Sequence, residues 1–307
     1  MTNKIRLPGC RPEPLMAYLK ALGVFRLVAE QADPAARAAW EGDTFVLHTS
    51  LGEAELLAFF QERYTPTPIV APWNGEDFFK LKDIAKTYQP QKKPKGAEVL
   101  AAILQSKTER LKPFRSAIRQ PLDVMSNLNI VREKPMEPGK QATLKIPGKG
   151  LKTQEVKALL VSSLRNHLDE SVVNWMDAAL ILETKSGFSP LFGTGGTDGN
   201  LDFALNFAQR LLDIGFAADE LVSKSEDWLK NALNGLAASG LLKGAAVGQY
   251  DPGRTGGVNA GQGLSGNSRV NPWEYVLMLE GALLMAGSVT RRLDAHAGEK
   301  GSFPFTV

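Results

Sequence analysis

Apolar residues recur at intervals of three and four along most of the chain, and this spacing constrains its fold more than any other feature. Within residues 12–31, Leu15, Leu19 and Leu22 follow it, and such a spacing places side chains on one face of an α-helix. The same pattern predicts further helices over residues 51–64, 98–120, 153–168, 170–183, 201–215, 218–237 and 272–296. The chain is therefore predicted to be mainly α-helical.

Local signals refine this prediction. The stretch TFVLHT, Thr44–Thr49, predicts a short strand. Asn271 followed by Pro272 is typical of a helix start, and Gly215 suits the left-handed position that follows a helix end. Irregular segments rich in Gly and Pro separate the helices, so the predicted fold class is mainly α with a few short strands (α+β).

The irregular segments suggest two domains. We expect an N-terminal α+β domain over residues 1–150, and a basic strip, defined as residues 80–157, begins within it. A mainly helical domain is expected over residues 151–307, with glycine-rich loops at 191–200 and 252–268. Loops of this length are commonly functional.

Charge is distributed unevenly, although the net charge is only +3. The basic strip carries 18 Lys and Arg against 7 Asp and Glu, a net of +11, and the rest of the chain has a net of −8. Cations that neutralise phosphates release counterions and give salt-dependent binding, so the strip predicts a polyanionic partner such as nucleic acid. A solvated surface is the alternative. Residues 131–150 of the strip are predicted to form a basic hairpin or linker.

Several function classes find little support in the sequence. Cys10 is the single cysteine, which fits a reducing cytoplasm, and the three histidines lack metal-ligand spacing. No apolar run is long enough to span a membrane, and the N-terminus lacks the apolar core of a signal peptide. No Ser/His/Asp, HExxH or Cys/His arrangement is recognisable. We therefore expect a protein without metal, cofactor or catalytic residues.

The loop LFGTGGTDGN, residues 191–200, places four glycines in ten residues. It lacks the Lys and Ser/Thr of a phosphate-binding NTPase loop, and its glycine spacing is one residue too long for a dinucleotide fingerprint. Glycine amides can still form an anion-binding nest beside a helix N-terminus, whereas a plain connector between two helices is the alternative. The stretch PWNG, with Asn74, is likewise either a turn that contacts bases or a turn held by a buried tryptophan.

Four sequence blocks occur in order over residues 7–293, namely LPGCRPEPLMAYLKALGVFRLVAEQ, YTPTPIVAPWNG, PLFGTGGTDGNLDFALNFAQRLLD and NPWEYVLMLEGALLMAGSVTRRL. Together they closely resemble the large subunit of type I-G (formerly I-U) CRISPR Cascade complexes. The chain departs from the family pattern at Glu76 and Asp77 after PWNG, and at Thr197 and Asn200 in the glycine loop. The family's proteins are longer, so we expect a natural C-terminal part, including a small-subunit-like helical bundle, to be absent from this sequence.

The resemblance implies a non-catalytic subunit near the 5′ end of the crRNA that recognises the protospacer-adjacent motif in duplex DNA and helps to unwind the target. The implied partners are the crRNA, the target DNA with its displaced strand, the backbone and small subunits of the complex, and a recruited helicase–nuclease that cleaves the DNA. We expect this subunit in the cytoplasm, without membrane contact. Two other functions stay open, a nucleotide-binding enzyme that uses residues 191–200 and a structural helical subunit that bridges proteins.

The candidate nucleic-acid-binding residues combine cations with polar side chains beside the irregular loops. They are Arg11, Asn74, Lys80, Lys82, Lys92, Lys93, Lys95, Arg115, Arg119, Thr194, Thr197, Asn200, Asn267 and Arg269.

Overall fold

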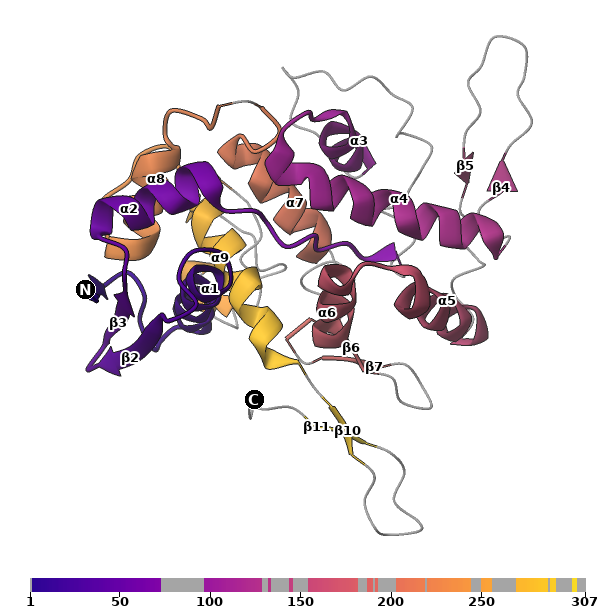
Figure 1. Cartoon of the computed structure of the whole chain (residues 1–307), viewed down its shortest axis with the longest axis horizontal. Coiled ribbons are helices and arrows are strands. Elements are labelled where there is room, and N and C mark those ends of the chain that lie inside the picture. The colour runs from indigo at the N-terminus through magenta and orange to yellow at the C-terminus, as the bar shows by residue number, and fades with distance from the viewer. Residues whose placement is uncertain are drawn as a thin grey trace. The chain divides into compact units, whose positions relative to one another are not determined.

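The structure is a computed structural model, shown in Figure 1. It describes residues 2–72, 97–128, 132–133, 144–145, 154–181, 187–189, 191–192, 203–218, 220–243, 250–255, 269–286, 288–290 and 300–302. Its α-helices are α1 (Leu15–Gln31), α2 (Glu53–Ala58), α3 (Ala97–Gln105), α4 (Lys112–Asn127), α5 (Gln154–His167), α6 (Glu170–Ala179), α7 (Phe203–Ile214), α8 (Ser225–Asn234) and α9 (Pro272–Ala282). Shorter helical turns within the described residues are a π-helix (Phe59–Arg63) and three 3-10 turns (Glu109–Leu111, Pro252–Thr255 and Leu283–Met285).

The strands are short. They are β1 (Asn3–Leu7), β2 (Arg37–Glu41), β3 (Thr44–Thr49), β4 (Arg132–Glu133), β5 (Leu144–Lys145), β6 (Leu180–Ile181), β7 (Gly187–Phe188), β8 (Leu242–Lys243), β9 (Arg269–Val270), β10 (Ser288–Thr290) and β11 (Lys300–Ser302). Every strand pair among the described residues is antiparallel. This mainly helical chain with a few short strands confirms the predicted fold class.

The chain forms two compact units, and their division differs from the predicted boundary at residue 150. The first unit holds the described residues between 2 and 65 and between 210 and 284. The second unit holds those between 66 and 209 and from 285 onwards. The first unit is therefore built from segments that are far apart in the sequence.

The first unit is organised around two helices and one sheet. Helices α1 and α9 pack closely against each other. Gly23 of α1 and Gly281 of α9 lie at this contact, and an added Cβ would be 1.9 Å from the carbonyl oxygen of Leu277 and 1.8 Å from that of Leu19, respectively. The sheet has the strand order β1-β3-β2. The two glycines thus let the helix backbones approach more closely than any side chain would allow.

Helix α9 begins as predicted, and its start is held by a buried polar network. The side chain of Asn271 accepts a hydrogen bond from the backbone N–H of Trp273 at 3.0 Å and donates to the carbonyl oxygen of Trp228 at 2.6 Å. Asn271 also donates to Asn231 Oδ1 at 2.8 Å. Pro272 occupies the first turn, where no helical partner for a backbone N–H exists. The predicted N-cap is therefore confirmed, and it links α9 to α8.

Several helix boundaries differ from the prediction, and three show the largest differences in how the helix ends. The helix expected over residues 272–296 ends at Ala282, because Ser288–Thr290 pairs instead with Lys300–Ser302 as β10 and β11. The helix expected over 170–183 ends at Ala179, because Leu180 and Ile181 pair with β7. The helix expected over 98–120 is two helices, α3 and α4. In the first two cases periodicity extends beyond the true helix end, since apolar strand residues are compatible with both patterns. In the third, the helix is interrupted between Gln105 and Lys112, and α4 continues to Asn127.

Two local predictions agree with the structure. β4 and β5 pair as an antiparallel ladder within residues 131–150, as the predicted hairpin requires. Gly215 follows the end of α7 with a φ of +106°, a left-handed conformation that glycine adopts without a side-chain clash.

Aromatic contacts and a buried side-chain hydrogen bond stabilise the second unit. The rings of Phe114 and Phe207 stack at a centroid distance of 6.3 Å, and Trp175 meets Phe192 edge-on at 5.0 Å. Trp175 Nε1 donates to the carbonyl oxygen of Val70 at 2.6 Å. The hydrogen bond ties α6 to the extended segment that follows the π-helix, and the stacked rings join α4 to α7.

In the first unit, Asp33 fixes the connection between α1 and β2. Its carboxylate accepts hydrogen bonds from the backbone N–H of Ser50 at 2.7 Å, from Thr49 Oγ1 at 2.7 Å and from the backbone N–H of Ala35 at 3.0 Å. The hydrogen bond from Ser50, followed by that from Thr49, lowers the pKa of Asp33 to about 2. The ionised carboxylate therefore stabilises this turn.

Replacing Asp33 with Asn is expected to lower the free energy of unfolding at neutral pH. Because the folded-state pKa lies below the ordinary value of 3.8, the stabilisation is present above that value and is lost as the pH falls toward 2. Urea unfolding of both proteins at about pH 7 and about pH 2.5 measures this, and the difference between them should shrink at the lower pH. An equal difference at both pH values would contradict the assignment.

Candidate functional site

Four of the candidate residues lie in the described part of the chain. Arg11 and Arg269 belong to the first unit, and Arg115 and Arg119 belong to the second. The candidates that lie outside the described residues are Asn74, Lys80, Lys82, Lys92, Lys93, Lys95, Thr194, Thr197, Asn200 and Asn267.

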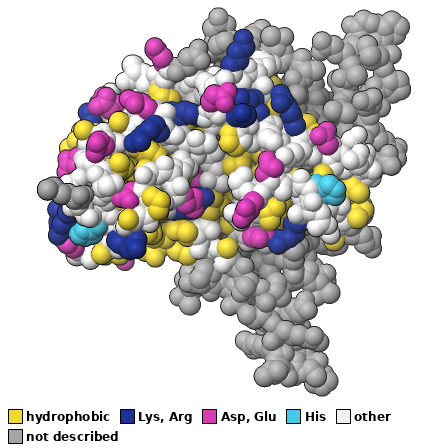
Figure 2. Space-filling model, viewed as in Figure 1, with side chains coloured by type: hydrophobic (Ala, Val, Ile, Leu, Met, Phe, Trp, Pro, Cys, Tyr) yellow, Lys and Arg dark blue, Asp and Glu magenta, His cyan; other side chains and the backbone are white. Residues whose placement is uncertain are grey.

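Helix α4 carries cations of the basic strip on one face, as the sequence predicted. Phe114 and Ile118 are buried, whereas Lys112 and Arg119 are exposed. Arg115 Nη1 donates to the carbonyl oxygen of Thr108 at 2.8 Å, so this side chain supports the turn before the helix. Figure 2 shows Lys and Arg side chains interspersed with Asp and Glu over the drawn face. Lys112 and Arg119 are thus solvent-facing members of the strip on α4.

A pocket of about 450 Å³ lies within the first unit, and it is lined by both Arg11 and Arg269. The segment before α1, the first turns of α1, the end of α8 and the residues around the start of α9 form its walls. Its charged lining residues are the cations Arg11, Lys20, Arg254 and Arg269 and the carboxylates Glu13, Asp251 and Glu274. The fold therefore brings together two candidates that stand near opposite ends of the sequence.

One wall of the pocket depends on a close backbone approach. The backbone N–H of Gly9 donates to the carbonyl oxygen of Leu233 at 2.8 Å, at the end of α8. A Cβ on Gly9 would lie 2.6 Å from the carbonyl oxygen of Ala232, so only glycine fits here. Gly235 ends α8 with a φ of +71° and also lines the pocket. These contacts hold the Arg11 segment against α8.

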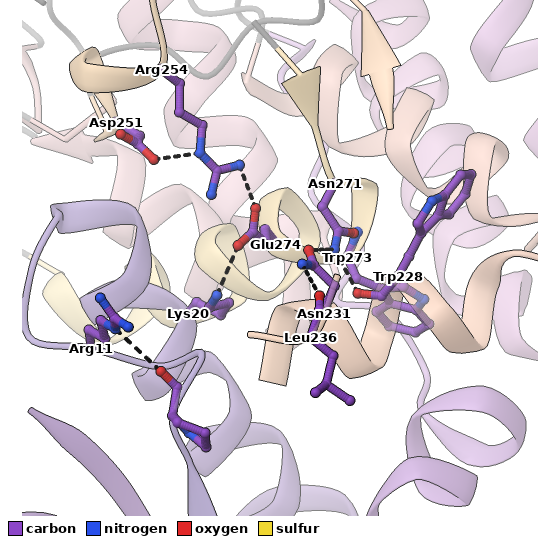
Figure 3. A network of polar contacts seen from close by, with 11 residues as sticks. Arg11, Lys20, Trp228, Asn231, Leu236, Asp251, Arg254, Asn271, Trp273 and Glu274 are labelled. Carbon is purple, nitrogen blue, oxygen red and sulfur yellow. Dashed lines mark hydrogen bonds and ion pairs between the residues drawn. The ribbon is translucent and has the colours of Figure 1, made fainter. Parts of the chain in front are cut away.

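The inner wall of the pocket is a chain of paired charges, drawn in Figure 3. Lys20 Nζ of α1 lies 3.1 Å from Glu274 Oε1 of α9. Arg254 bridges two carboxylates, with Nη1 at 2.6 Å from Glu274 Oε2 and Nε at 2.7 Å from Asp251 Oδ2. Lys20 and Glu274 are only 2% and 8% exposed at their side chains, so the pair is shielded from water. The two cations and two carboxylates neutralise each other.

The pKa directions agree with this pairing. Burial alone would raise the pKa of Glu274, but Lys20 and Arg254 hold it below its usual value. Burial would lower the pKa of Arg254, but its hydrogen bonds and charge interactions with Glu274 and Asp251 raise it. Nearby, burial raises the pKa of the fully buried Cys10 thiol to about 11, despite the opposing charge of Lys20. Glu274 therefore stays ionised and Cys10 stays a neutral thiol near neutral pH.

The other two arginines of the pocket, Arg11 and Arg269, differ from Arg254 in their partners. Arg11 and Arg269 are both exposed, and neither forms an ion pair with a carboxylate of the described residues. Arg11 uses its Nε for a long hydrogen bond of 3.4 Å to the carbonyl oxygen of Pro8. Arg269 lies in β9, where it is the register partner of Lys243. Guanidinium groups of this kind match the oxygens of phosphates and carboxylates.

The charged residues of the inner wall were not among the residues predicted from the sequence. Glu274 carries no local motif, because its partners Lys20 and Arg254 are distant in the sequence, and the pair Asp251 and Arg254, although only three residues apart, matches no motif. Lys20 could have been identified from the sequence, because it lies four residues after the buried Met16 and four before the buried Val24. A lysine on the apolar face of a predicted helix indicates a buried ion pair.

The described residues contain no group of three or more His, Cys, Asp or Glu side chains that could hold a metal ion. Within the same part of the chain, no helix combines the length and apolar character that a membrane span requires. A scan against protein-family models finds no match for this chain, and a search of curated proteins finds none either.

Proposed function

We propose that this chain is a non-catalytic, nucleic-acid-binding large subunit of a type I-G CRISPR effector complex. In this role it recognises the protospacer-adjacent motif in duplex DNA, near the 5′ end of the crRNA, and helps to separate the target strands. Its partners are the crRNA, the target DNA, the backbone and small subunits, and a helicase–nuclease that is recruited for cleavage. It acts in the cytoplasm.

One structural observation carries the nucleic-acid part of this proposal. Arg11 and Arg269 line the same pocket, are exposed, and lack carboxylate partners among the described residues. Exposed guanidinium groups without acidic partners are suited to phosphate contacts. The charge of the basic strip and the four ordered sequence blocks support the same conclusion from the sequence.

Binding of motif-randomised duplex DNA by the assembled complex, with and without this subunit, tests the proposal. We expect enrichment of one short motif only when the subunit is present. The affinity should fall steeply with salt, because each phosphate contact releases counterions. Binding that lacks both motif preference and salt dependence would favour the structural bridging subunit. Nucleotide turnover that disappears when Gly195 becomes valine would favour the enzyme.

Two sets of substitutions separate affinity from motif recognition. Changing Lys92, Lys93 and Lys95 to glutamine should weaken binding to all duplexes alike and should reduce the log–log salt slope by about 2.7. Changing Asn74 to alanine should instead narrow the affinity gap between correct and incorrect motifs. An Asn74 variant with unchanged motif preference would remove this residue from the recognition site.

A further inference from the structure

The pocket of the first unit is lined by two exposed arginines and by a wall of paired charges. Lys20 and Arg254 are matched by Glu274 and Asp251, so this wall contributes no net charge. Of the other charged lining residues, Arg11 and Arg269 are cations and Glu13 is a carboxylate. The lining therefore has a net charge of +1, and Arg11 and Arg269 are its cations that form no ion pair with described residues.

This arrangement suits an oxyanion bound by two guanidinium groups. Each guanidinium has five N–H donors in a planar fork that fits phosphate oxygens. Arg11 directs only its Nε toward the protein, at 3.4 Å from the carbonyl oxygen of Pro8. The terminal nitrogens of Arg11 and Arg269 form no ion pair with described residues. A phosphate group can therefore use them without displacing an existing carboxylate.

The pocket is also larger than a phosphate group needs. Its volume of about 450 Å³ is in the range of sites that bind whole small molecules. Pro14, Met16 and Leu241 supply apolar atoms beside the charged lining. A nucleoside attached to the phosphate can lie against such a surface. A base-paired nucleotide cannot enter a concave site, because its base is stacked inside the duplex.

We infer that this pocket holds one unpaired nucleotide of a nucleic-acid strand. Arg11 and Arg269 bind its phosphate, and the apolar residues contact its nucleoside. The inference rests on the proposed nucleic-acid-binding function and names the ligand that this pocket takes. A free nucleotide and a single strand both present a phosphate with its nucleoside. Of these two ligands, we assign the single strand to this pocket.

The test compares two variants of the full chain that lose the same charge. The first carries Arg11→Gln and Arg269→Gln, in the pocket. The matched control carries Arg6→Gln and Arg37→Gln, which are exposed on β1 and β2 of the same unit and do not line the pocket. The probes are a short fluorescent single-stranded oligonucleotide, the same sequence as a duplex, adenosine monophosphate and inorganic phosphate. Circular dichroism and thermal unfolding verify that both variants fold, as expected for exposed substitutions.

We expect the pocket variant to bind the single strand at least about tenfold more weakly than the wild type, since each charge-assisted contact is worth about one decade. Its log–log salt slope should fall by about 0.7, the value for one neutralised phosphate on a single strand. The control variant should lose much less affinity for the single strand. Duplex binding should be affected equally by both variants.

Three results would overturn the inference. Equal loss of single-strand affinity in both variants would show that the pocket is not the site. A larger loss for the duplex than for the single strand would rule out an unpaired nucleotide. Adenosine monophosphate or inorganic phosphate binding as tightly as the oligonucleotide would assign the pocket to a free ligand. If instead the proposed nucleic-acid-binding function is wrong, the wild-type protein will bind neither the single strand nor the duplex. That result differs from all three above.

Discussion

Replacing Gly23 or Gly281 with alanine is expected to disrupt the first unit, because either change places a methyl group inside the backbone of the opposite helix. An alanine Cβ at residue 23 would lie 1.9 Å from the carbonyl oxygen of Leu277, and one at residue 281 would lie 1.8 Å from that of Leu19. Alanine favours a helix over glycine by about 1 kcal/mol, but overpacking a rigid contact costs about 3 kcal/mol or more. We therefore expect a net loss of about 2 kcal/mol or more for each variant.

Urea unfolding measures this loss, and the thiol of Cys10 reports it locally. Cys10 is fully buried and has a pKa of about 11, so thiol reagents should label it only when the first unit opens. Gly52→Ala is the matched control, since its Cβ would be 3.5 Å from Glu55 Oε2, an ordinary contact. Wild-type stability in the Gly23 and Gly281 variants would show that α1 and α9 do not pack through these glycines.

Replacing Glu280 with glutamine is expected to destabilise the same unit by about 3 kcal/mol, because a buried ion pair loses its negative charge. Glu280 is 0% exposed, and its Oε2 lies 2.7 Å from Arg26 Nη1. Its Oε1 accepts a hydrogen bond from the hydroxyl of Tyr64 at 2.6 Å. Burial would lower the pKa of Arg26, but the charges of Glu280 and then Glu30 raise it above its ordinary value. In the Glu280→Gln variant, the carboxylate paired with the Arg26 guanidinium is that of the half-exposed Glu30.

The control for this charge removal is Glu41→Gln. Glu41 pairs with Lys4 and Arg6 on the surface, where side chains are 39% to 52% exposed. Exposed pairs of this kind contribute less than about 1 kcal/mol. Chemical unfolding should therefore show a clearly larger loss in the free energy of unfolding for Glu280→Gln than for Glu41→Gln. Equal losses would mean that the Glu280 cluster contributes no more to stability than a surface ion pair.

Sequence periodicity was sufficient to predict most helices of this chain. The strand Thr44–Thr49 was predicted with its exact bounds, as was the cap at Asn271. Both depend on short-range signals, which are β-branched content and a capping side chain before proline. β1 and β2 were not predicted, because each needs the central strand β3 as its partner before its backbone hydrogen bonds are satisfied.

The pocket likewise separates what the sequence predicts from what only tertiary packing decides. Arg11 and Arg269 could be selected from the sequence as cations beside irregular segments, but their common location could not. That location depends on the packing of α1 against α9 through two glycines and on the contact of Gly9 with the end of α8. The inner wall was missed for the same reason, since Glu274 meets Lys20 and Arg254 only after those elements have packed.

The sequence by itself determined the class of the fold, the approximate helices, the helix start at Asn271 and the uneven distribution of charge. These properties follow from side-chain spacing and local backbone preference, which act over a few residues. The tertiary structure alone decided which segments form the first unit, where α9 ends, and which charged side chains share one pocket. Those outcomes depend on contacts between residues far apart in the chain, whose free energy arises only when apolar surface is buried and charges are paired across the packed elements.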